Sequence, residues 1–285
     1  MALQTRFQAV NTSVAVNEAL KELKNIIPKQ DFIQHEATIR SVLEVAADTE
    51  NELTNIMSPF MDKISIKEVE NKISPTIGHD RAEMIKNAFS FETYKMKLVK
   101  KSDGQSAVQV HRGGAEYLPE IKLAKIQDVI KSKEIQITSI IIEIFMLVFK
   151  CGGITDDFTE YQMRAASQEL EAIVRQSTFQ RALREFIEEW NRGDAWARAK
   201  AIFVFLKSTY ALGIFWKIIK ILFTQMSTFK NIRALAECAV MIVAAVATEG
   251  VALIARLALS IDNAVALVEK MVNMSNFEKE EKNLR

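Results

Sequence analysis

The sequence predicts a mainly α-helical protein with a small β-hairpin near residues 93–111 and a C-terminal apolar helical hairpin at residues 195–272. Its 285 residues include only nine Gly and four Pro, which favours long helices over a many-turned β-sandwich. Hydrophobic residues make up 49% of the chain and charged residues 26%, a composition typical of folded rather than disordered proteins. Apolar residues also recur at spacings of three and four in many segments, as on one face of a helix.

Residues 1–92 are expected to form an N-terminal helical region. Pro28 and Pro59 bracket one long helix, because neither residue fits a helix interior without breaking a hydrogen bond. Asp80 followed by Glu83 has the spacing of a capping box and predicts the start of a further helix. The long helix carries one apolar stripe, formed by Ile39, Val42, Ala46, Thr49, Leu53 and Ile56.

Residues 93–118 have a different pattern, which predicts a β-hairpin followed by a loop. A turn signal, Ser-Asp-Gly at 102–104, separates two alternating stretches. Glycines at 113 and 114 close the irregular region. The alternating apolar residues are Tyr94, Met96 and Leu98 before the turn, and Val108 and Val110 after it.

Residues 119–285 are expected to form a C-terminal helical bundle, and all three regions can belong to one domain. A helix starting at Pro119 should end near Gly152, although the β-branched residues after Ile135 leave a strand open as an alternative. A capping box at Asp157 and Glu160 precedes a helical pattern that runs to Trp190, and Asp194 should cap the next helix.

The apolar hairpin at 195–272 contains two segments joined by a short connection at 227–231. The first segment has no single polar face, whereas the second has a narrow polar stripe and many alanines. Neither is an ordinary transmembrane span, because Lys207, Glu237 and Glu249 interrupt the apolar runs. The hairpin is therefore either the core of a large helical bundle or a core that opens when it meets a membrane.

A helical chain with a sequestered apolar hairpin and no permanent span resembles the α-helical pore-forming toxins in architecture, over residues 135–272. The resemblance implies a toxin or defence effector that is soluble first, inserts the hairpin into a lipid membrane, and forms homo-oligomers there through the Ala-rich face of the second segment. The basic hairpin near 93–111 departs from the apolar β-tongue with which some of these toxins contact membranes.

Three sets of residues are the candidates for such a membrane activity. Insertion would use the apolar residues Phe203, Phe205, Phe215, Trp216, Ile218, Ile221, Phe223, Val243, Val246 and Leu253. Lipid headgroups, preferably anionic ones, would bind the basic residues Lys200, Lys207, Lys217, Lys220, Lys230 and Arg233. A pH switch would use two carboxyl groups that lie inside apolar runs, if burial raises their pKa. These are the carboxyl groups of Glu143 and Glu249.

No pattern in the sequence points to catalysis, a metal or a cofactor. The histidines are scattered, and neither a phosphate-binding loop nor an activated nucleophile is present. Cys151 and Cys238 have no C-x-x-C spacing, which favours two small buried hydrophobes over a disulfide. We therefore expect a protein that is not an enzyme and has no cofactor.

The net charge of +1 creates no general attraction to nucleic acid, and no partner of that kind is expected. The N-terminus lacks the basic and apolar regions of a secretory signal. The alternative function is a non-enzymatic helical module that binds a protein partner or an apolar ligand and keeps the apolar hairpin permanently buried.

Overall fold

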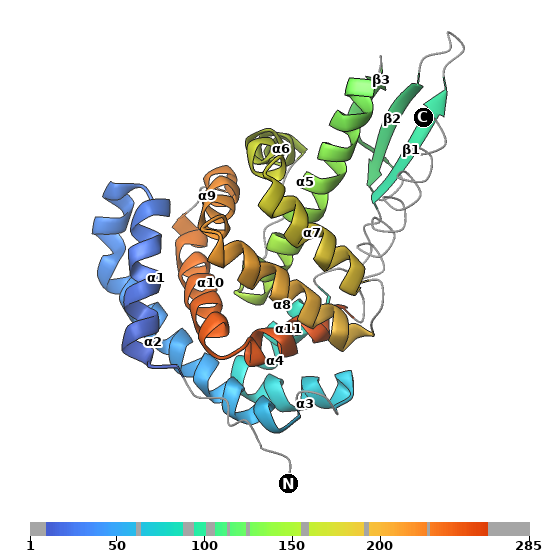
Figure 1. Cartoon of the computed structure of the whole chain (residues 1–285). Helices are drawn as coiled ribbons and strands as arrows, with labels where there is room; N and C mark the ends of the chain where they lie inside the picture. Colours follow the sequence, from blue (N-terminus) through green and yellow to red (C-terminus); the bar gives the residue numbers. More distant parts are fainter. Residues whose placement is uncertain are drawn as a thin grey trace.

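The computed structural model describes residues 10–60, 64–87, 94–100, 106–112, 115–123, 126–154, 160–190, 194–226 and 229–261, and this part of the chain is mainly helical, as predicted (Figure 1). The helices are α1 Thr12–Ile26, α2 Lys29–Met57, α3 Ile66–Ile77, α4 His79–Lys86, α5 Ile126–Cys151, α6 Glu160–Val174, α7 Ser177–Trp190, α8 Ala195–Ala211, α9 Phe215–Met226, α10 Phe229–Ala247 and α11 Val251–Ile261. A short 3-10 turn at Ser58–Phe60 follows α2. The strands are β1 Tyr94–Lys100, β2 Ser106–Arg112 and β3 Ala115–Leu123.

Helices α1 and α2 pack side by side (Figure 1). The long helix predicted between the two prolines is confirmed, since α2 begins directly after Pro28 and ends at Met57. Its buried stripe includes Ile39, Leu43, Ala47, Glu50 and Leu53, so it shares Ile39 and Leu53 with the predicted stripe and is shifted by one position elsewhere. The other four predicted members, Val42, Ala46, Thr49 and Ile56, are half-buried at the edge of this face.

The capping box predicted at Asp80 is wrong. Helix α4 begins at His79 after Gly78, so Asp80 lies in its first turn and makes no cap hydrogen bond. The capping box is instead in α3, where Ser65 accepts from the backbone N–H of Glu68 and the Glu68 carboxylate accepts from the backbone N–H of Ser65. Gly78 decides the difference, because its φ of 90° ends α3 and sets where α4 can begin.

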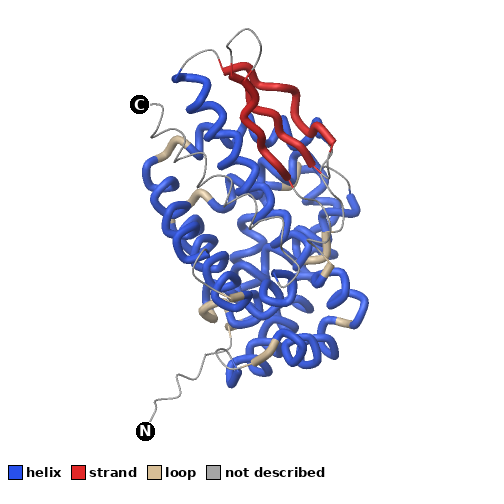
Figure 2. The backbone as a smooth tube through the Cα atoms, turned by 90° about the vertical axis from the view of Figure 1, so that its right-hand side faces the viewer, coloured by secondary structure: helices blue, strands red, loops and turns tan. Residues whose placement is uncertain are grey.

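The strands form a three-stranded antiparallel sheet in the order β1-β2-β3, at one end of the helical body (Figure 2). In the β1–β2 pair, Tyr94 lies opposite Arg112 and Lys100 opposite Ser106. The expected hairpin has two strands, whereas the sheet has three. Strand β3 lies where a loop and a helix start were expected. Pro119 lies within β3 rather than at a helix start, a position open to proline on an edge strand.

Helix α5 ends at Cys151 as predicted, and the segment after Ile135 is helical rather than a strand. The helical pattern that runs to Trp190 is divided into α6 and α7 by a break after Val174. Asp194 caps α8 as predicted, because its carboxylate accepts from the backbone N–H of Ala197 at 2.9 Å. The capping box predicted at Asp157 lies outside the described residues.

The apolar hairpin is not formed by two long helices, because each segment is broken. The chain bends by 101° between α8 and α9, and by 115° between α10 and α11. Both breaks have the hydrogen bond of a Schellman cap: Ile214 donates to the carbonyl of Thr209 at 3.0 Å, and Gly250 donates to that of Ala245 at 2.7 Å. The left-handed residues there are Gly213 and, at the second break, Glu249 followed by Gly250. Residues 262–272 of the predicted hairpin lie outside the described part.

The core is centred on α11, whose residues are all buried. This helix packs against α8, α2, α3, α4 and α5, and α10 packs against α1 and α2. The N-terminal helices and the apolar C-terminal helices therefore contribute to one hydrophobic cluster. In Figure 1, α11 lies among α4, α8 and α10, which the contacts of these helices bear out.

Candidate functional site

The membrane-insertion candidates all lie on the broken apolar helices α8 to α11. Trp216, Ile221 and Val246 are half-buried. The buried members are Phe203, Phe205, Phe215, Ile218, Phe223, Val243 and Leu253. Exposure of this set to lipid would therefore require the helices to leave their present packing.

Aromatic contacts hold these helices against the rest of the body. The ring of Phe205 lies 5.7 Å from that of Phe179 and 5.3 Å from that of Phe186, both on α7. On α9, the ring of Phe215 lies 5.3 Å from that of Phe145 on α5. Such aromatic pairs contribute about 0.5–1.5 kcal/mol each beyond the area that they bury, so α8 and α9 are each fastened to a neighbouring helix.

The predicted headgroup residues are spread over α8, α9 and α10. Lys217 and Lys220 are exposed on α9, Lys200 is half-buried on α8, and the Arg233 side chain on α10 is 75% exposed. Lys207 is already paired, because its ammonium lies 2.7 Å from the carboxylate of Glu249. The Lys230 side chain lies outside the described set.

The two carboxyls of the expected pH switch differ in their surroundings. Glu143 is half-buried on α5. The expected burial of Glu249 is wrong, because its side chain is 63% exposed and pairs with Lys207. Glu249 lies at the break between α10 and α11 with a left-handed φ of 54°, and the apolar residues around it in sequence leave its side chain exposed.

No single helix in the described ranges has both the length and the apolar character needed to cross a membrane. Two bent pairs meet those criteria jointly, namely 195–211 with 215–225 and 232–247 with 251–261. Mostly buried core helices of proteins that never meet a membrane meet the same criteria, so composition alone does not separate the two hypotheses.

A charged cavity of about 620 Å³ lies beside these helices, and sequence analysis did not predict it. Residues of α2, α4, α10 and α11 and the end of α5 contribute to its wall. The charged residues that line it are Glu50, Arg81, Arg233, Glu237 and Arg256. Three guanidinium groups thus face two carboxylates, which leaves one positive charge in excess.

Glu237 of α10 is the centre of one part of this network. Its carboxylate pairs with Arg81 of α4, and Arg233 lies one helical turn away with Nε 3.4 Å from Oε1. Arg81 also donates from Nη2 to the carbonyl oxygen of Gly152 at 2.6 Å. These contacts join α4, α10 and the end of α5, and they satisfy the partly buried carboxylate of Glu237.

The ion pair of Arg256 and Glu50 forms the deeper part of the network. Both side chains are only 4% exposed, and Arg256 donates from Nη1 to the Glu50 carboxylate. Burial raises the pKa of Glu50, and the nearby Arg256 offsets part of that rise. Nε of Arg256 is buried and has no hydrogen-bond partner among the described residues, so this guanidinium keeps an unused donor.

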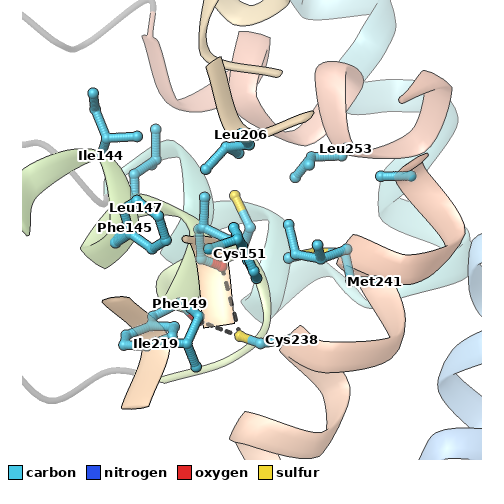
Figure 3. Close-up of a cluster of buried hydrophobic side chains, with 14 of the residues drawn as sticks. Ile144, Phe145, Leu147, Phe149, Cys151, Leu206, Ile219, Cys238, Met241 and Leu253 are labelled. Carbon is cyan, nitrogen blue, oxygen red and sulfur yellow. Dashed lines mark hydrogen bonds between the residues drawn. The ribbon is translucent and has the colours of Figure 1, made fainter. Parts of the chain in front are cut away.

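Cys151 and Cys238 are free and buried, as predicted. Cys238 contacts the carbonyl oxygens of Phe149 at 3.6 Å and Val148 at 3.7 Å, at the end of α5 (Figure 3). Burial raises the pKa of Cys151 to about 12 and also raises that of Cys238. Both groups are therefore neutral thiols near pH 7, packed as small hydrophobes.

The cavity escaped sequence analysis because its charges come from segments far apart in the chain. One usable signal was present: Glu237 and Arg256 interrupt the most apolar part of the sequence. A charge buried in such a segment needs a partner, and the partners lie on α4 and α2. No spacing rule connects those positions.

Among the described residues, no group of three or more His, Cys, Asp and Glu side chains is arranged to hold a metal ion. Comparison of the chain with models of protein families, with curated proteins and with solved structures found no match.

Proposed function

We propose that this protein is a membrane-active helical protein, a pore-forming toxin or defence effector, which stores α8 to α11 inside a soluble fold and inserts them into lipid. The observation that carries the proposal is the pair of bent apolar units, each long and apolar enough to span a membrane when straightened. At about 1.5 Å per residue, either unit would extend beyond the roughly 30 Å of hydrocarbon in a bilayer.

The breaks within these units support the proposal. Gly213 and Gly250 have positive φ values of 66° and 77°, and glycine changes between left-handed and right-handed backbone at low cost. A change at Gly213, and at Gly250 together with the left-handed Glu249, would let α8 continue into α9 and α10 into α11. The same glycines permit the sharp bends that keep the apolar helices short enough to be enclosed by the body.

The buried charges set the cost of insertion. Removing α10 and α11 from the body would separate Glu237 from Arg81 and Arg256 from Glu50. One charge at the centre of a bilayer costs about 2.5–3.5 kcal/mol on insertion scales. Burial of one large apolar side chain contributes about 1.5–3 kcal/mol relative to water, and α10 and α11 would keep this contribution in lipid because most of their apolar residues are already buried in the body. The two separated charges therefore dominate the cost of insertion.

A crosslink between α10 and the end of α5 tests the proposal. A Cβ placed on Gly152 would lie 3.1 Å from Cβ of Cys238, a few tenths of an ångström below the usual separation of about 3.5–4.5 Å in a disulfide. The variant Gly152→Cys in a Cys151→Ala background therefore holds two thiols that can be joined by oxidation during refolding. The bond would tie one insertion unit to the body.

Dye release from liposomes is the measurement. We expect release by the reduced double variant, loss of release after oxidation, and recovery with a reducing agent. Cys151→Ala treated with the same oxidant is the matched control and should release dye throughout. Release that is unchanged by a crosslink verified by mass spectrometry would show that α10 stays in the body, and no release under any lipid composition or pH would remove the proposal.

A second candidate function is a non-enzymatic helical module that binds a protein partner or an apolar ligand and keeps α8 to α11 buried. The buried ion pair of Arg256 and Glu50 favours it, because this pair fastens the central helix α11 to α2. Under this hypothesis the crosslinked and reduced proteins behave alike in every lipid assay, and function resides in a site on the folded body.

A further inference from the structure

The charged cavity is open on one side and closed on the other. The residues of α2 at its mouth, including Thr38, Ser41 and Val45, are exposed, as is Arg233 on α10. The opposite wall contains buried residues, including Arg256 and Met241. A ligand would therefore enter between α2 and α10 and reach the charged floor.

The charges of the cavity favour a ligand with a single negative charge. Two of the three guanidinium groups are balanced by Glu50 and Glu237. The remaining positive charge matches one carboxylate, whereas a phosphate monoester brings a charge of about −1.5 to −2. Arg256 also keeps a buried Nε–H without a partner among the described residues, and a carboxylate is the acceptor that fits a guanidinium fork.

The uncharged walls favour an apolar ligand body. Val42 and Ala46 contribute half-buried small side chains from α2, and the buried Met241 lines the cavity from α10. Small side chains leave room for the ligand, and methionine adapts its shape to apolar groups. A volume of about 620 Å³ is typical of sites for small organic molecules.

We infer that this cavity binds an organic monocarboxylate with a short apolar chain, whose carboxylate meets the arginines of the floor and whose chain lies along α2. The inference gives the second candidate function its ligand class and rests on that function. Ligand binding is measured without lipid, so a failure of this test is distinguishable from a failure of the membrane proposal.

Isothermal titration calorimetry with octanoate tests the inference, and octanamide and octyl phosphate serve as reference ligands. Octanoate should bind, and neutral octanamide of the same length should bind at least about tenfold more weakly, the equivalent of about 1.4 kcal/mol. Octyl phosphate should also bind more weakly than octanoate. Octanamide binding as well as octanoate would overturn the role of the arginines, and tighter binding of octyl phosphate would overturn the choice of a carboxylate.

Two variants and one control locate the site. Ala46→Phe fills the cavity from α2 and should abolish octanoate binding, whereas Ile33→Phe, on an exposed position of the same helix, should leave binding unchanged. Arg233→Gln at the mouth should weaken binding several-fold without unfolding the protein, because this side chain is 75% exposed. Unchanged binding by Ala46→Phe, or no binding of octanoate up to about 10 mM, an affinity below about 3 kcal/mol, would overturn the inference.

Discussion

Arg256 of α11 and Glu50 of α2 form an ion pair in the interior, where each side chain is only 4% exposed. Replacing one partner leaves the other as an uncompensated buried charge, which costs about 3–5 kcal/mol. We expect Arg256→Met and Glu50→Leu each to lower the free energy of unfolding by this amount. The double variant should be more stable than either single variant, as measured by urea unfolding.

The surface ion pair of Lys24 and Glu36 is the control for these Arg256 and Glu50 variants. Its side chains are 57% and 43% exposed, and its charged atoms are 3.7 Å apart. Exposed pairs contribute about 0–1 kcal/mol, so Lys24→Met should change the unfolding free energy little. Additive effects of Arg256→Met and Glu50→Leu would show that the two side chains do not depend on each other.

Gly250 is expected to tolerate alanine much less well than Gly213. Both residues have positive φ, which costs alanine about 1–2 kcal/mol. At Gly250 the added Cβ would also lie 2.6 Å from the ring of Phe203, whereas at Gly213 nothing lies within 4 Å. Overpacking adds about 1–3 kcal/mol, so Gly250→Ala should have the lower midpoint in thermal unfolding. Equal midpoints for the two variants would contradict the close packing of α8 on this turn.

Gly152→Ala should be partly rescued by Cys238→Ala. A Cβ on Gly152 would lie 2.0 Å from Sγ of Cys238, so alanine there forces the sulfur to move. Removal of the sulfur makes room, although Cα and Cβ of residue 238 remain 3.1 Å away. In denaturant unfolding, the double variant should exceed Gly152→Ala in stability by about 1 kcal/mol, in the range of overpacking effects. A double variant less stable than Gly152→Ala would refute this contact.

The two thiols should react with iodoacetamide only after unfolding. Burial raises the pKa of Cys151 to about 12, so almost no reactive thiolate exists at pH 8. A raised folded-state pKa stabilises the fold below the unfolded pKa of 9.0, and this contribution is lost as the pH rises toward about 12. Mass spectrometry should show no label at pH 8 in water and two labels in urea. Rapid labelling of the native protein would contradict the burial of both residues.

Lipid binding should strengthen with anionic lipid and weaken with salt, because Lys217 and Lys220 are exposed on α9. Lys217→Gln with Lys220→Gln should reduce vesicle binding, whereas Lys21→Gln with Lys29→Gln on α1 and α2 should not. Sedimentation with vesicles of stated anionic content measures both. Equal loss in the two double variants would point to net charge rather than to α9.

Local sequence patterns predicted several helix boundaries, but they did not predict which elements pack against one another. The prolines around α2, the cap at Asp194 and the glycines after Cys151 are short-range signals, and the structure has each boundary where these signals lie. The break at Glu249 was missed because a left-handed turn is most easily recognised from glycine, and here a glutamate precedes the glycine. The sequence does not reveal the third strand, because Pro119 and the helical pattern after it predict a helix there, whereas Pro119 lies within β3.

The sequence by itself determined that the chain is mainly helical and that residues 195–261 are its most apolar part, because helix formation and apolar character depend on nearby residues. Only the tertiary structure decided that α11 lies at the centre, that Arg256 meets Glu50, and that a cavity with excess positive charge opens beside them. The physical reason is distance along the chain: residues 50, 81, 237 and 256 interact only after packing has brought α2, α4, α10 and α11 together, and no local spacing encodes that arrangement.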